Sequence, residues 1–445
     1  MDPKETMVQQ STIANASSPP LLSEPDQQDR SSRFFAECYQ KAGPVFRLSR
    51  PNKPPLTILV GPDANTFVAR YEYEYFTTQE HWQEIYDNLK SGKVSRVRDG
   101  EANRTHRTRS SRYYSRARVL NFLPRMVEIA QEFTQWKPGE SFVALASMQR
   151  VVVEQLGPLL VGRSPGDYFP DIIYYQDRLG ASIGRSDSED LLSPAYLEAQ
   201  MRVSLLAYAI LEKHKTSTSI NGENDLVDDL LADARKYPEA YPDQILYSTT
   251  LTPFLAGLTT ARTCCSMLYA LLKHKQVYAR VQAEVDAAFE QGPPTWERMK
   301  AMQDLQGAAM ETLRLYPVAN AHMCHVVKPC TFAGYLLEPG SDVLVPMTAP
   351  HFMAEFFPEP ETFDIDRYRA PRNEHRHRGV YAPFGLGDHT CLGSGIAEVQ
   401  LMAIIATILH TYQLELDPPD YKFESHQSLR LLEKNLSIKV IARRD

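Results

Sequence analysis

Apolar and polar residues alternate between residues 45 and 60 and then give way to a helical period. The stretch 43–70 (GPVFRLSRPNKPPLTILVGPDANTFVAR) carries this alternation on both sides of a proline-rich turn. After the letters GPDA, the apolar residues recur at helical spacing. Alternation is typical of strands, whereas a period of about 3.6 residues is typical of helices. The pattern therefore predicts a short hairpin followed by a helix.

Helical periods dominate the chain from Pro124 to Pro317. Residues 242–274 are apolar on most faces. A helix that is apolar nearly all round belongs inside a core, so this segment is expected to be a buried central helix. The stretch 296–317 (WERMKAMQDLQGAAMETLRLYP) predicts another helix that ends at its proline.

A second small β-rich stretch is predicted at 331–347, before a proline-rich segment and a last apolar helix at 393–412. The pattern gives a mainly α fold with small β-sheets near residues 45–60 and 330–345. No repeat or linker divides the chain, so residues 33–445 are expected to form a single domain. Residues 1–32 are polar and rich in Ser, Pro and Gln, which predicts a disordered N-terminal tail.

Composition and charge exclude some classes of protein. The chain of 445 residues is 43% hydrophobic and 10% aromatic, with a formal net charge of -7. This balance supplies a sizeable core and gives no global indication of nucleic-acid binding. The six cysteines are too scattered for a disulfide framework. Since no signal peptide and no run of about 20 apolar residues is visible, a soluble cytoplasmic protein without a membrane anchor is expected.

Residues 384–393 (FGLGDHTCLG) contain three glycines close to one thiol, that of Cys391. A small buried side chain is the default interpretation of such a cysteine. A zinc site would need further ligand pairs at short spacing, and none stands nearby. A cysteine nucleophile would need a well-placed base, and His389, two residues away in a glycine turn, has poor geometry for that role.

A metal-bound thiolate fits the loop better. Gly385, Gly387 and Gly393 allow a flat macrocycle to approach the backbone closely. The helix that follows Cys391 would stabilise an anionic sulfur through its N-terminal dipole. His389 could donate a hydrogen bond to a porphyrin carboxylate, and Phe384 could shield the sulfur from water.

This loop resembles the heme-binding loop of the cytochrome P-450 superfamily, F-x-x-G-x-[R/H]-x-C-x-G. Its five specified positions match Phe384, Gly387, His389, Cys391 and Gly393. Three upstream motifs stand in the family's order. They are ETLR with Glu311 and Arg314, PETFDIDRY with Arg367, and AGLTT with Ala256, Gly257, Thr259 and Thr260. The resemblance covers roughly residues 43–440.

The resemblance implies the P-450 fold, a triangular helical prism with a β-rich minor region, of the soluble bacterial type. It implies heme b (iron protoporphyrin IX) with Cys391 as axial iron ligand, and a structural Glu311–Arg314–Arg367 network. It further implies a monooxygenase that inserts one atom of dioxygen into an apolar terpenoid, steroid or fatty-acid-like substrate. Ala256 and Gly257 would shape the oxygen site with Thr260.

Two departures from the family pattern keep alternatives open. Thr259 stands where many members carry an acid that supplies protons to bound dioxygen. A peroxide-driven or oxidative-coupling enzyme is therefore one alternative, and a non-catalytic heme sensor or carrier is another. His325 and His389 stand where many members hold the heme carboxylates with arginine, which leaves Arg107 as the remaining cation. Histidine adds charge only when it is protonated.

Residues 90–118 hold ten Lys and Arg against two acids, in an acidic protein. A solvated face is the simplest interpretation. The resemblance places this region beside the cofactor, where a ferredoxin or flavodoxin-type electron donor would dock by charge complementarity. Arg107 would face the heme, while Arg104, Arg109 and Arg112 would face the partner. Substrate contacts are expected from residues 75–95, 165–205, 250–260 and 319–324.

Overall fold

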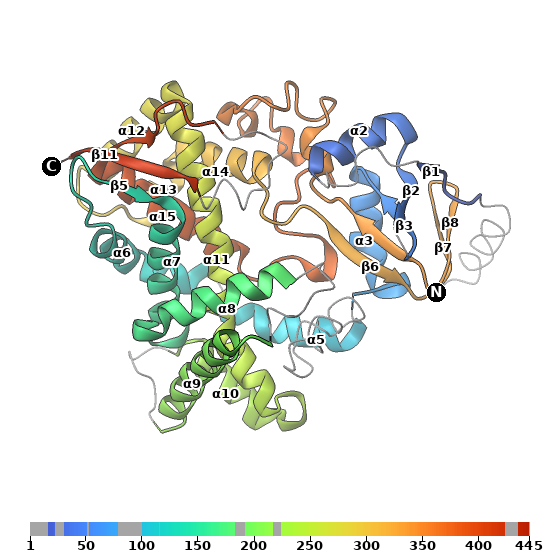
Figure 1. The fold of residues 1–445 in the computed structure, drawn as a ribbon, viewed down its shortest axis with the longest axis horizontal. Coiled ribbons are helices and arrows are strands. Elements are labelled where there is room, and N and C mark those ends of the chain that lie inside the picture. Colours follow the sequence, from blue (N-terminus) through green and yellow to red (C-terminus); the bar gives the residue numbers. More distant parts are fainter. Residues whose placement is uncertain are drawn as a thin grey trace. The chain divides into compact units, whose positions relative to one another are not determined.

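In the structure, a computed structural model, the described residues are 17–22, 31–50, 53–78, 100–114, 116–182, 192–216, 224–422 and 435–444. The chain groups into two compact units. Unit 1 comprises residues 1–83, 96–106 and 313–391, and unit 2 comprises 84–95, 107–312 and 392–445. The expectation of a single domain over residues 33–445 stays a prediction. Figure 1 labels many of the helices and strands of both units.

Unit 1 is built on a six-stranded sheet with the order β1-β2-β3-β9-β6-β4. Its strands are β1 (Leu21–Leu22), β2 (Val45–Arg50), β3 (Lys53–Leu59), β9 (Asp342–Val345), β6 (His322–Val326) and β4 (Phe76–Thr77). Strands β2 and β3 are antiparallel, which confirms the hairpin predicted from the alternation. Strand β3 also pairs in parallel with β9, so the two predicted β regions join one sheet.

The predicted N-terminal tail contributes a strand to this sheet. Leu21 and Leu22 form β1 and pair in parallel with Arg47 and Leu48 of β2. Residues 1–16 and 23–30 of the tail lie outside the described residues. The two leucines supply a local apolar pair that overall composition does not reveal.

Helix α3 (Pro62–Tyr75) turns one face toward the core of unit 1. Its buried residues Ala64, Val68, Glu72 and Tyr75 recur every three or four positions, as expected for an amphipathic helix. The apolar members pack into the same core cluster as the strand residues. Glu72 is the acidic residue on this buried face, and its partners are described below.

Further elements of unit 1 are α2 (Ser32–Ala42), β7 (Cys330–Phe332), β8 (Tyr335–Leu337) and short 3₁₀ helices. The 3₁₀ helices are η6 (Ala349–Phe352), η7 (Ile365–Tyr368), η8 (Glu374–Arg376) and η9 (Gly387–His389). Strands β7 and β8 form an antiparallel pair. Helix α2 begins after Ser31, whose side chain accepts a hydrogen bond from the Phe34 N–H.

Unit 2 is mostly helical. Its helices are α6 (Arg116–Phe133), α7 (Ala144–Val161), α8 (Phe169–Ser182), α9 (Pro194–Thr216), α10 (Leu226–Lys236), α11 (Asp243–Lys273), α12 (Lys275–Phe289), α13 (Trp296–Ala301) and α15 (Ser394–Thr411). The 3₁₀ helices are η2 (Ser111–Tyr114), η3 (Gly166–Tyr168) and η5 (Pro238–Ala240). A small sheet has the order β10-β11-β5, with β10 (Tyr412–Asp417), β11 (Ser437–Arg443) and β5 (Ser141–Val143). Helices α5 (Gly100–Ser110) and α14 (Gln303–Leu315) contribute residues to both units.

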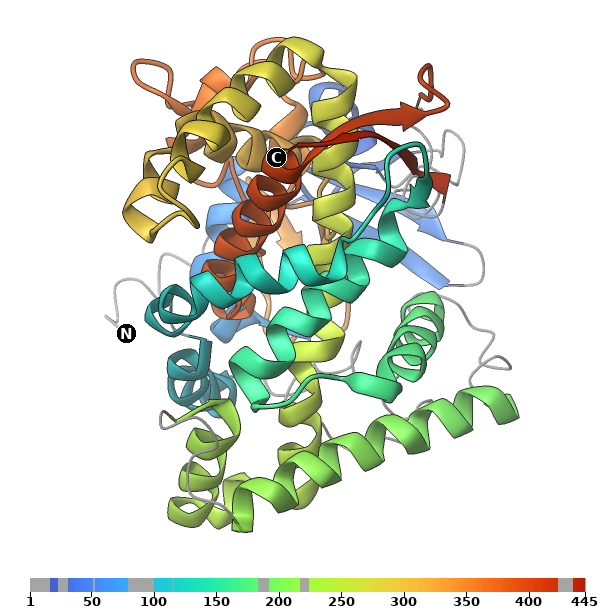
Figure 2. The same cartoon turned by 90° about the vertical axis from the view of Figure 1, so that its left-hand side faces the viewer.

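The long apolar segment predicted as a buried central helix is α11, and the prediction is confirmed. It packs on α7, α9 and α15, and Figure 2 shows it in yellow-green among these helices. A Cβ atom on Gly257 would lie 2.4 Å from Leu156 Cδ1 of α7, and one on Gly157 of α7 would lie 3.0 Å from Phe254. The absence of side chains at these two glycines therefore brings α7 and α11 close together.

Two of the described helices, α11 and α15, are long and apolar enough to cross a membrane. However, 78% of the most apolar window of α11 and 67% of that of α15 are buried inside the structure. Core helices of soluble proteins share these properties.

The single helix predicted over 296–317 is instead two helices, α13 and α14, so that prediction was wrong. Helix α13 ends at Ala301, and the backbone of the next residue, Met302, is no longer helical. The carboxylate of Glu284 then accepts hydrogen bonds from the N–H groups of Asp304 and Leu305, at 3.1 and 2.9 Å. The first N–H groups of a helix have no partner within the helix, and these bonds satisfy two of them at the start of α14. A side chain of α12 therefore divides a continuous helical pattern.

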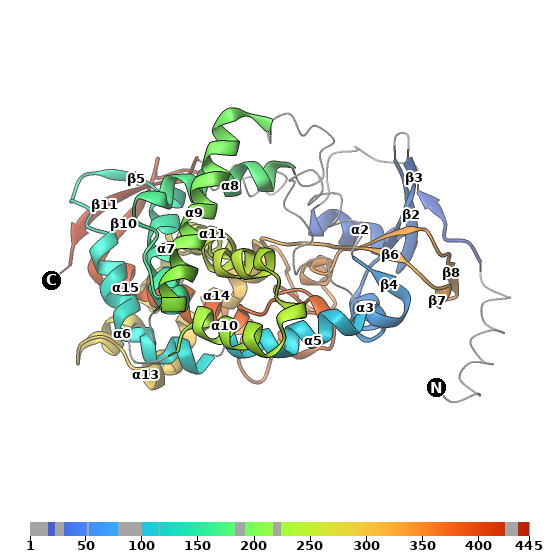
Figure 3. The same cartoon turned by 90° about the horizontal axis from the view of Figure 1, so that it is seen from below.

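Helices α9 and α10 are joined by a buried histidine; both helices are visible in Figure 3. The Nδ1 atom of His214 lies 2.8 Å from the carbonyl oxygen of Ile210, and Nε2 lies 2.9 Å from Asp225 Oδ2. Because both ring nitrogens face acceptors, the protonated ring, which has two N–H donors, fits this arrangement best. Burial alone would lower the pKa of His214, but the hydrogen bonds to Asp225 and Ile210 and the charges of Asp225 and Asp228 raise it.

This pairing predicts a pH-dependent contribution to stability. A raised folded-state pKa stabilises the fold fully below about pH 6.5, the ordinary value, and the contribution is lost as the pH rises through the folded pKa. His214→Gln is expected to lower the free energy of unfolding, and to lower it by about 1 kcal/mol more at about pH 6 than at about pH 9. Denaturant titration of the wild type and the variant at both pH values measures this difference. A difference that is the same at both pH values would contradict this assignment.

Candidate active site

Cys391 lies at the end of a loop that folds back on itself. Its backbone N–H donates to the carbonyl oxygen of Phe384 at 2.8 Å, and the N–H of His389 donates to Leu386 at 3.1 Å. Cys391 is exposed, whereas the other five cysteines are buried. Burial raises the pKa of the Cys264 thiol, and that of the Cys330 thiol to about 12. The sulfur available to an external group is therefore the one that the motif predicts.

Two glycines of the loop have backbone conformations that favour glycine. Gly385 has φ +89° and Gly387 has φ +52°. A Cβ atom on Gly387 would lie 2.9 Å from Ala69 Cα and 3.0 Å from the Ala69 carbonyl oxygen of α3. Gly387 therefore allows the loop to lie directly against α3. Gly393 has φ -88° and is the N-cap residue of α15, so the loop ends where this helix begins.

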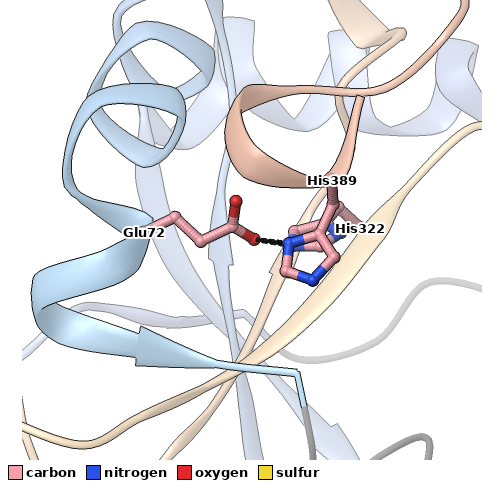
Figure 4. A group of neighbouring side chains, drawn as sticks. All are labelled: Glu72, His322 and His389. Atoms are coloured by element: carbon pink, nitrogen blue, oxygen red, sulfur yellow. Dashed lines mark hydrogen bonds and ion pairs between the residues drawn. The ribbon is translucent and has the colours of Figure 1, made fainter. Parts of the chain in front are cut away.

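His389 is held by Glu72, a residue that the sequence analysis did not single out. Glu72 Oε1 lies 2.8 Å from His389 Nδ1 and 2.7 Å from Nε2 of His322 on β6. Figure 4 shows the two imidazole rings facing this one carboxylate. On the other side of the ring, His389 Nε2 lies 3.1 Å from the Thr78 hydroxyl.

The cluster keeps Glu72 ionised. Burial alone would raise the pKa of Glu72, but the hydrogen bonds from His322 and His389, with their charges, lower it to about 2. The other carboxylate oxygen, Oε2, is buried and accepts no hydrogen bond from the described residues. The ionised carboxylate of Glu72 thus contacts two imidazoles, one of which, that of His389, belongs to the cysteine loop.

The second predicted histidine, His325, has a separate partner. Its Nδ1 lies 3.1 Å from Asp342 Oδ1, and Asp342 also pairs with Arg50 at 2.8 Å. Burial alone would raise the pKa of Asp342, but hydrogen bonds from Arg50 and His325 lower it. The structure therefore supplies His325 and His389 each with its own carboxylate.

The predicted arginines Arg314 and Arg367 are fully buried in unit 1 and share an acceptor. Arg314 donates to the His351 carbonyl oxygen at 2.6 Å and to that of Thr362 at 3.3 Å. Arg367 donates to the same Thr362 oxygen at 3.2 Å and to Glu374 at 3.0 Å. It also donates to the carbonyl oxygens of Pro358 and Glu359. Glu311 is buried as well, one helical turn before Arg314 on α14.

His351 links this arginine network to the segment before the cysteine loop. Its Nδ1–H donates to the Arg314 carbonyl oxygen at 3.2 Å, and its Nε2 accepts the N–H of Ala382 at 3.1 Å. Burial and the charge of Arg314 lower the pKa of His351 to about 3, so the ring is neutral. The network thus fixes the backbone two residues ahead of Phe384.

On α11, the four residues of the predicted oxygen site differ in how far they are buried. Ala256 and Thr259 are exposed, whereas Gly257 and Thr260 are buried. The Thr259 hydroxyl donates to the carbonyl oxygen of Ala256 at 2.7 Å. Gly257 packs against Leu156 of α7. The roles of these residues toward a cofactor stay predictions.

The described part of the basic region is largely paired within the molecule. Arg104, Arg112 and Arg118 form ion pairs with Asp388, Asp233 and Asp229, and Arg116 pairs with Glu398. Arg109 stacks over the ring of Tyr237 at 3.8 Å. Arg107, the predicted heme cation, is partly buried on α5. Residues 90–99 lie outside the described residues. Acids distant in sequence reduce the positive potential that the local composition predicts.

The residues present fit a heme group. An exposed thiol lies in a loop closed by its own backbone, and two imidazoles with fixed carboxylate partners supply donors for the heme carboxylates. Glu72 and Glu374 were not predicted from the sequence, and His322 was predicted only as part of the substrate-contact segment 319–324. One signal could have indicated Glu72, because a glutamate on the apolar face of an amphipathic helix requires a buried partner.

Comparisons with known proteins agree with this geometry. A family model described as "Cytochrome P450" matches residues 21–441. The chain is 32% identical over 193 residues to the sterol 14alpha-demethylase of Mycolicibacterium vanbaalenii, covering 43% of each protein. It is 30% identical over 225 residues to the cyclooctat-9-en-7-ol 5-monooxygenase of Streptomyces melanosporofaciens, covering 50% of this chain and 49% of that one. These matches span less than half the length of either relative.

A solved structure, "Retinoic acid bound cyanobacterial CYP120A1", superposes with a TM-score of 0.78 at 20% identity. The superposition covers 96% of this chain and 100% of the other. At this identity the likeness concerns the fold alone, and it confirms the fold class expected from the sequence.

Proposed function

The chain belongs to the cytochrome P450 family of heme-thiolate proteins, and from this premise we propose that it is a monooxygenase acting on an apolar organic substrate. The observation that carries the proposal is the exposed Cys391 in a loop that its own backbone closes. Monooxygenation consumes dioxygen, two electrons and two protons, and yields a hydroxylated product and water.

In this proposal, Cys391 would hold the heme iron through its thiolate, and His389 and His325 would bind the heme carboxylates. Arg107 is proposed as a further cation for these carboxylates, as the resemblance implies. When bound, the heme supplies a site for dioxygen activation that the thiolate makes more electron-rich. Phe384, partly buried at the start of the loop, shields the sulfur from water. Gly385 and Gly387 permit the backbone path that presents the sulfur.

This chain departs from the family pattern at Thr259, where many members carry the acid that supplies protons to bound dioxygen. Thr259 cannot act as an acid, and its hydroxyl hydrogen is directed to the Ala256 carbonyl oxygen. Its lone pairs can still accept a hydrogen bond from water. We infer that Thr260 orients the oxygen site and that protons arrive through water, to which the Thr259 hydroxyl makes only a minor contact.

Thr260→Ala is therefore expected to lower the product formed per dioxygen consumed by about tenfold or more, with hydrogen peroxide released instead. Thr259→Ala should change this ratio by less than about threefold, since its hydroxyl already has a backbone partner. Product and peroxide are quantified in the same reaction. A larger effect for Thr259→Ala than for Thr260→Ala would reverse the two roles.

Family members typically receive electrons from separate redox proteins. We propose a ferredoxin or flavodoxin-type donor that docks near residues 90–118. Arg112 and Arg116 support this docking surface, since their side chains stay 53% and 47% exposed although each is paired. A soluble cytoplasmic location, as expected from the sequence, is proposed with it.

The substrate class proposed is a terpenoid, a steroid or a fatty-acid-like molecule. Two relatives support an apolar substrate by name, one a sterol 14alpha-demethylase and the other a cyclooctat-9-en-7-ol 5-monooxygenase. The predicted contact segment 319–324 is described and includes the partly buried His322 and Met323. Parts of the other predicted segments, residues 79–95 and 183–191, lie outside the described residues.

The proposal is tested by turnover of a terpenoid and steroid panel under isotopically labelled dioxygen, with ferredoxin, its reductase and NADPH. One labelled oxygen atom in the product is expected. A second candidate, a peroxide-driven enzyme, is favoured by the absence of an acid at Thr259, and product from peroxide alone would support it. A heme protein that turns over with neither oxidant would contradict both and indicate a sensor or carrier.

A further inference from the structure

The cluster of Glu72, His322 and His389 joins three separate elements of unit 1. Glu72 belongs to α3, His322 to β6 and His389 to η9. The side chains of Glu72, His322 and His389 are only 5%, 16% and 19% exposed. The two rings lie 5.5 Å apart between centroids and are tilted by 36°. Residues far apart in the sequence thus form one compact polar group that includes His389 of the cysteine loop.

The hydrogen-bond geometry determines which nitrogen of each ring carries hydrogen toward Glu72. A carboxylate only accepts hydrogen bonds, so the facing atoms must be donors. Distances of 2.7 and 2.8 Å to Oε1 are those of charge-assisted N–H···O bonds. His322 Nε2 and His389 Nδ1 therefore carry hydrogen, and His322 Nδ1 and His389 Nε2 are left to face other groups.

Gly387 makes this arrangement possible. A Cβ atom at this position would lie 3.1 Å from Glu72 Oε2, in addition to its close approach to Ala69. The glycine of the cysteine loop thus brings η9 close enough to α3 for one carboxylate to reach both imidazoles.

We propose that Glu72 is a positioning residue for heme binding, which orients His389 and also His322, and that His322 joins His389 in binding the heme carboxylates. This inference rests on the proposed function. Glu72 acts on the cofactor through the two rings: it holds each ring by one N–H, so that the opposite nitrogen, when the ring is protonated, can donate to a heme carboxylate. For His389 this nitrogen is Nε2, which also lies 3.1 Å from the Thr78 hydroxyl. Residues that orient cofactor-binding histidines in this way affect affinity without touching the cofactor.

The test is the rate at which the holoenzyme releases heme to excess apomyoglobin. Glu72→Gln keeps the side-chain volume and removes the charge, and it is expected to accelerate release by about tenfold. Glu74→Gln removes the same charge two residues further along α3, from a partly exposed side chain on another face of the helix, and should leave the rate unchanged. Equal rates for Glu72→Gln and the wild type would overturn the proposal.

A double-mutant comparison separates positioning from a general effect on folding. In a background carrying His322→Ala and His389→Ala, Glu72→Gln should accelerate heme release no further. If it accelerates release by the same factor as in the wild type, Glu72 does not act through the histidines and the proposal fails. Stoichiometric zinc in the purified holoenzyme that is absent from Glu72→Gln would also overturn it, because the cluster would then be a metal site.

The proposed function and this inference fail in different ways. A wild-type protein without a heme-thiolate carbonyl spectrum would remove the proposed function and the inference with it. A wild type that has this spectrum, together with a Glu72→Gln variant that retains heme equally well, would remove the inference alone.

Discussion

Arg367→Ala is expected to lower the free energy of unfolding by about 3–5 kcal/mol, enough to prevent accumulation of folded protein in many preparations. Its guanidinium is 1% exposed and donates to Glu374 and to three carbonyl oxygens. Truncation leaves these acceptors buried without their donor, and this desolvation accounts for most of the expected loss.

The matched control is Arg369→Ala, two residues away. Arg369 is partly exposed and pairs with Asp366 at 3.1 Å, a geometry that contributes at most about 1 kcal/mol. Both variants are measured by denaturant titration followed by circular dichroism. Losses within about 1 kcal/mol of each other would contradict the view that the buried network fixes the backbone leading to the cysteine loop.

Gly387→Ala is expected to destabilise the protein by about 1–3 kcal/mol more than Gly334→Ala. Both glycines have positive φ, +52° and +82°, so both variants share the backbone strain of a left-handed alanine. A Cβ atom at 334 meets nothing within 4 Å, whereas one at 387 meets the backbone of Ala69. The difference between the two variants therefore isolates the close approach of the loop to α3.

The two stabilities are compared by thermal and denaturant unfolding of the holoenzyme, together with the heme content of each preparation. Gly387→Ala should also bind less heme, since α3 and the loop must separate to accommodate the methyl group. If the two alanine variants are equally stable and equally loaded with heme, the loop does not depend on contact with α3.

Contiguous patterns were predictable from the sequence. The motif around Cys391 lies within ten consecutive residues, and α11 is apolar on nearly every face. Both could therefore be identified without knowledge of distant partners. The β2–β3 hairpin followed from local alternation and a proline-rich turn. In each case the residues that determine the structure are neighbours in the chain.

Features that depend on distant partners were not predictable in the same way. Glu72 meets His322 across 250 positions and His389 across 317, and no local period encodes these contacts. The division between α13 and α14 depends on Glu284, a residue of another helix. The pairing of the basic region depends on acids such as Asp233 and Asp388, so a count of local charges overestimates its potential.

The central claim is that the Cys391 thiolate binds heme iron, and the absorbance spectrum of the reduced, carbonyl-bound protein tests it most directly. We expect a band at about 450 nm in the wild type, as thiolate ligation produces. Cys391→Ser should lack this band, while Cys38→Ser, at a buried cysteine in unit 1, should retain it. A wild type without the band, or a Cys391→Ser variant that keeps it unchanged, would contradict the account.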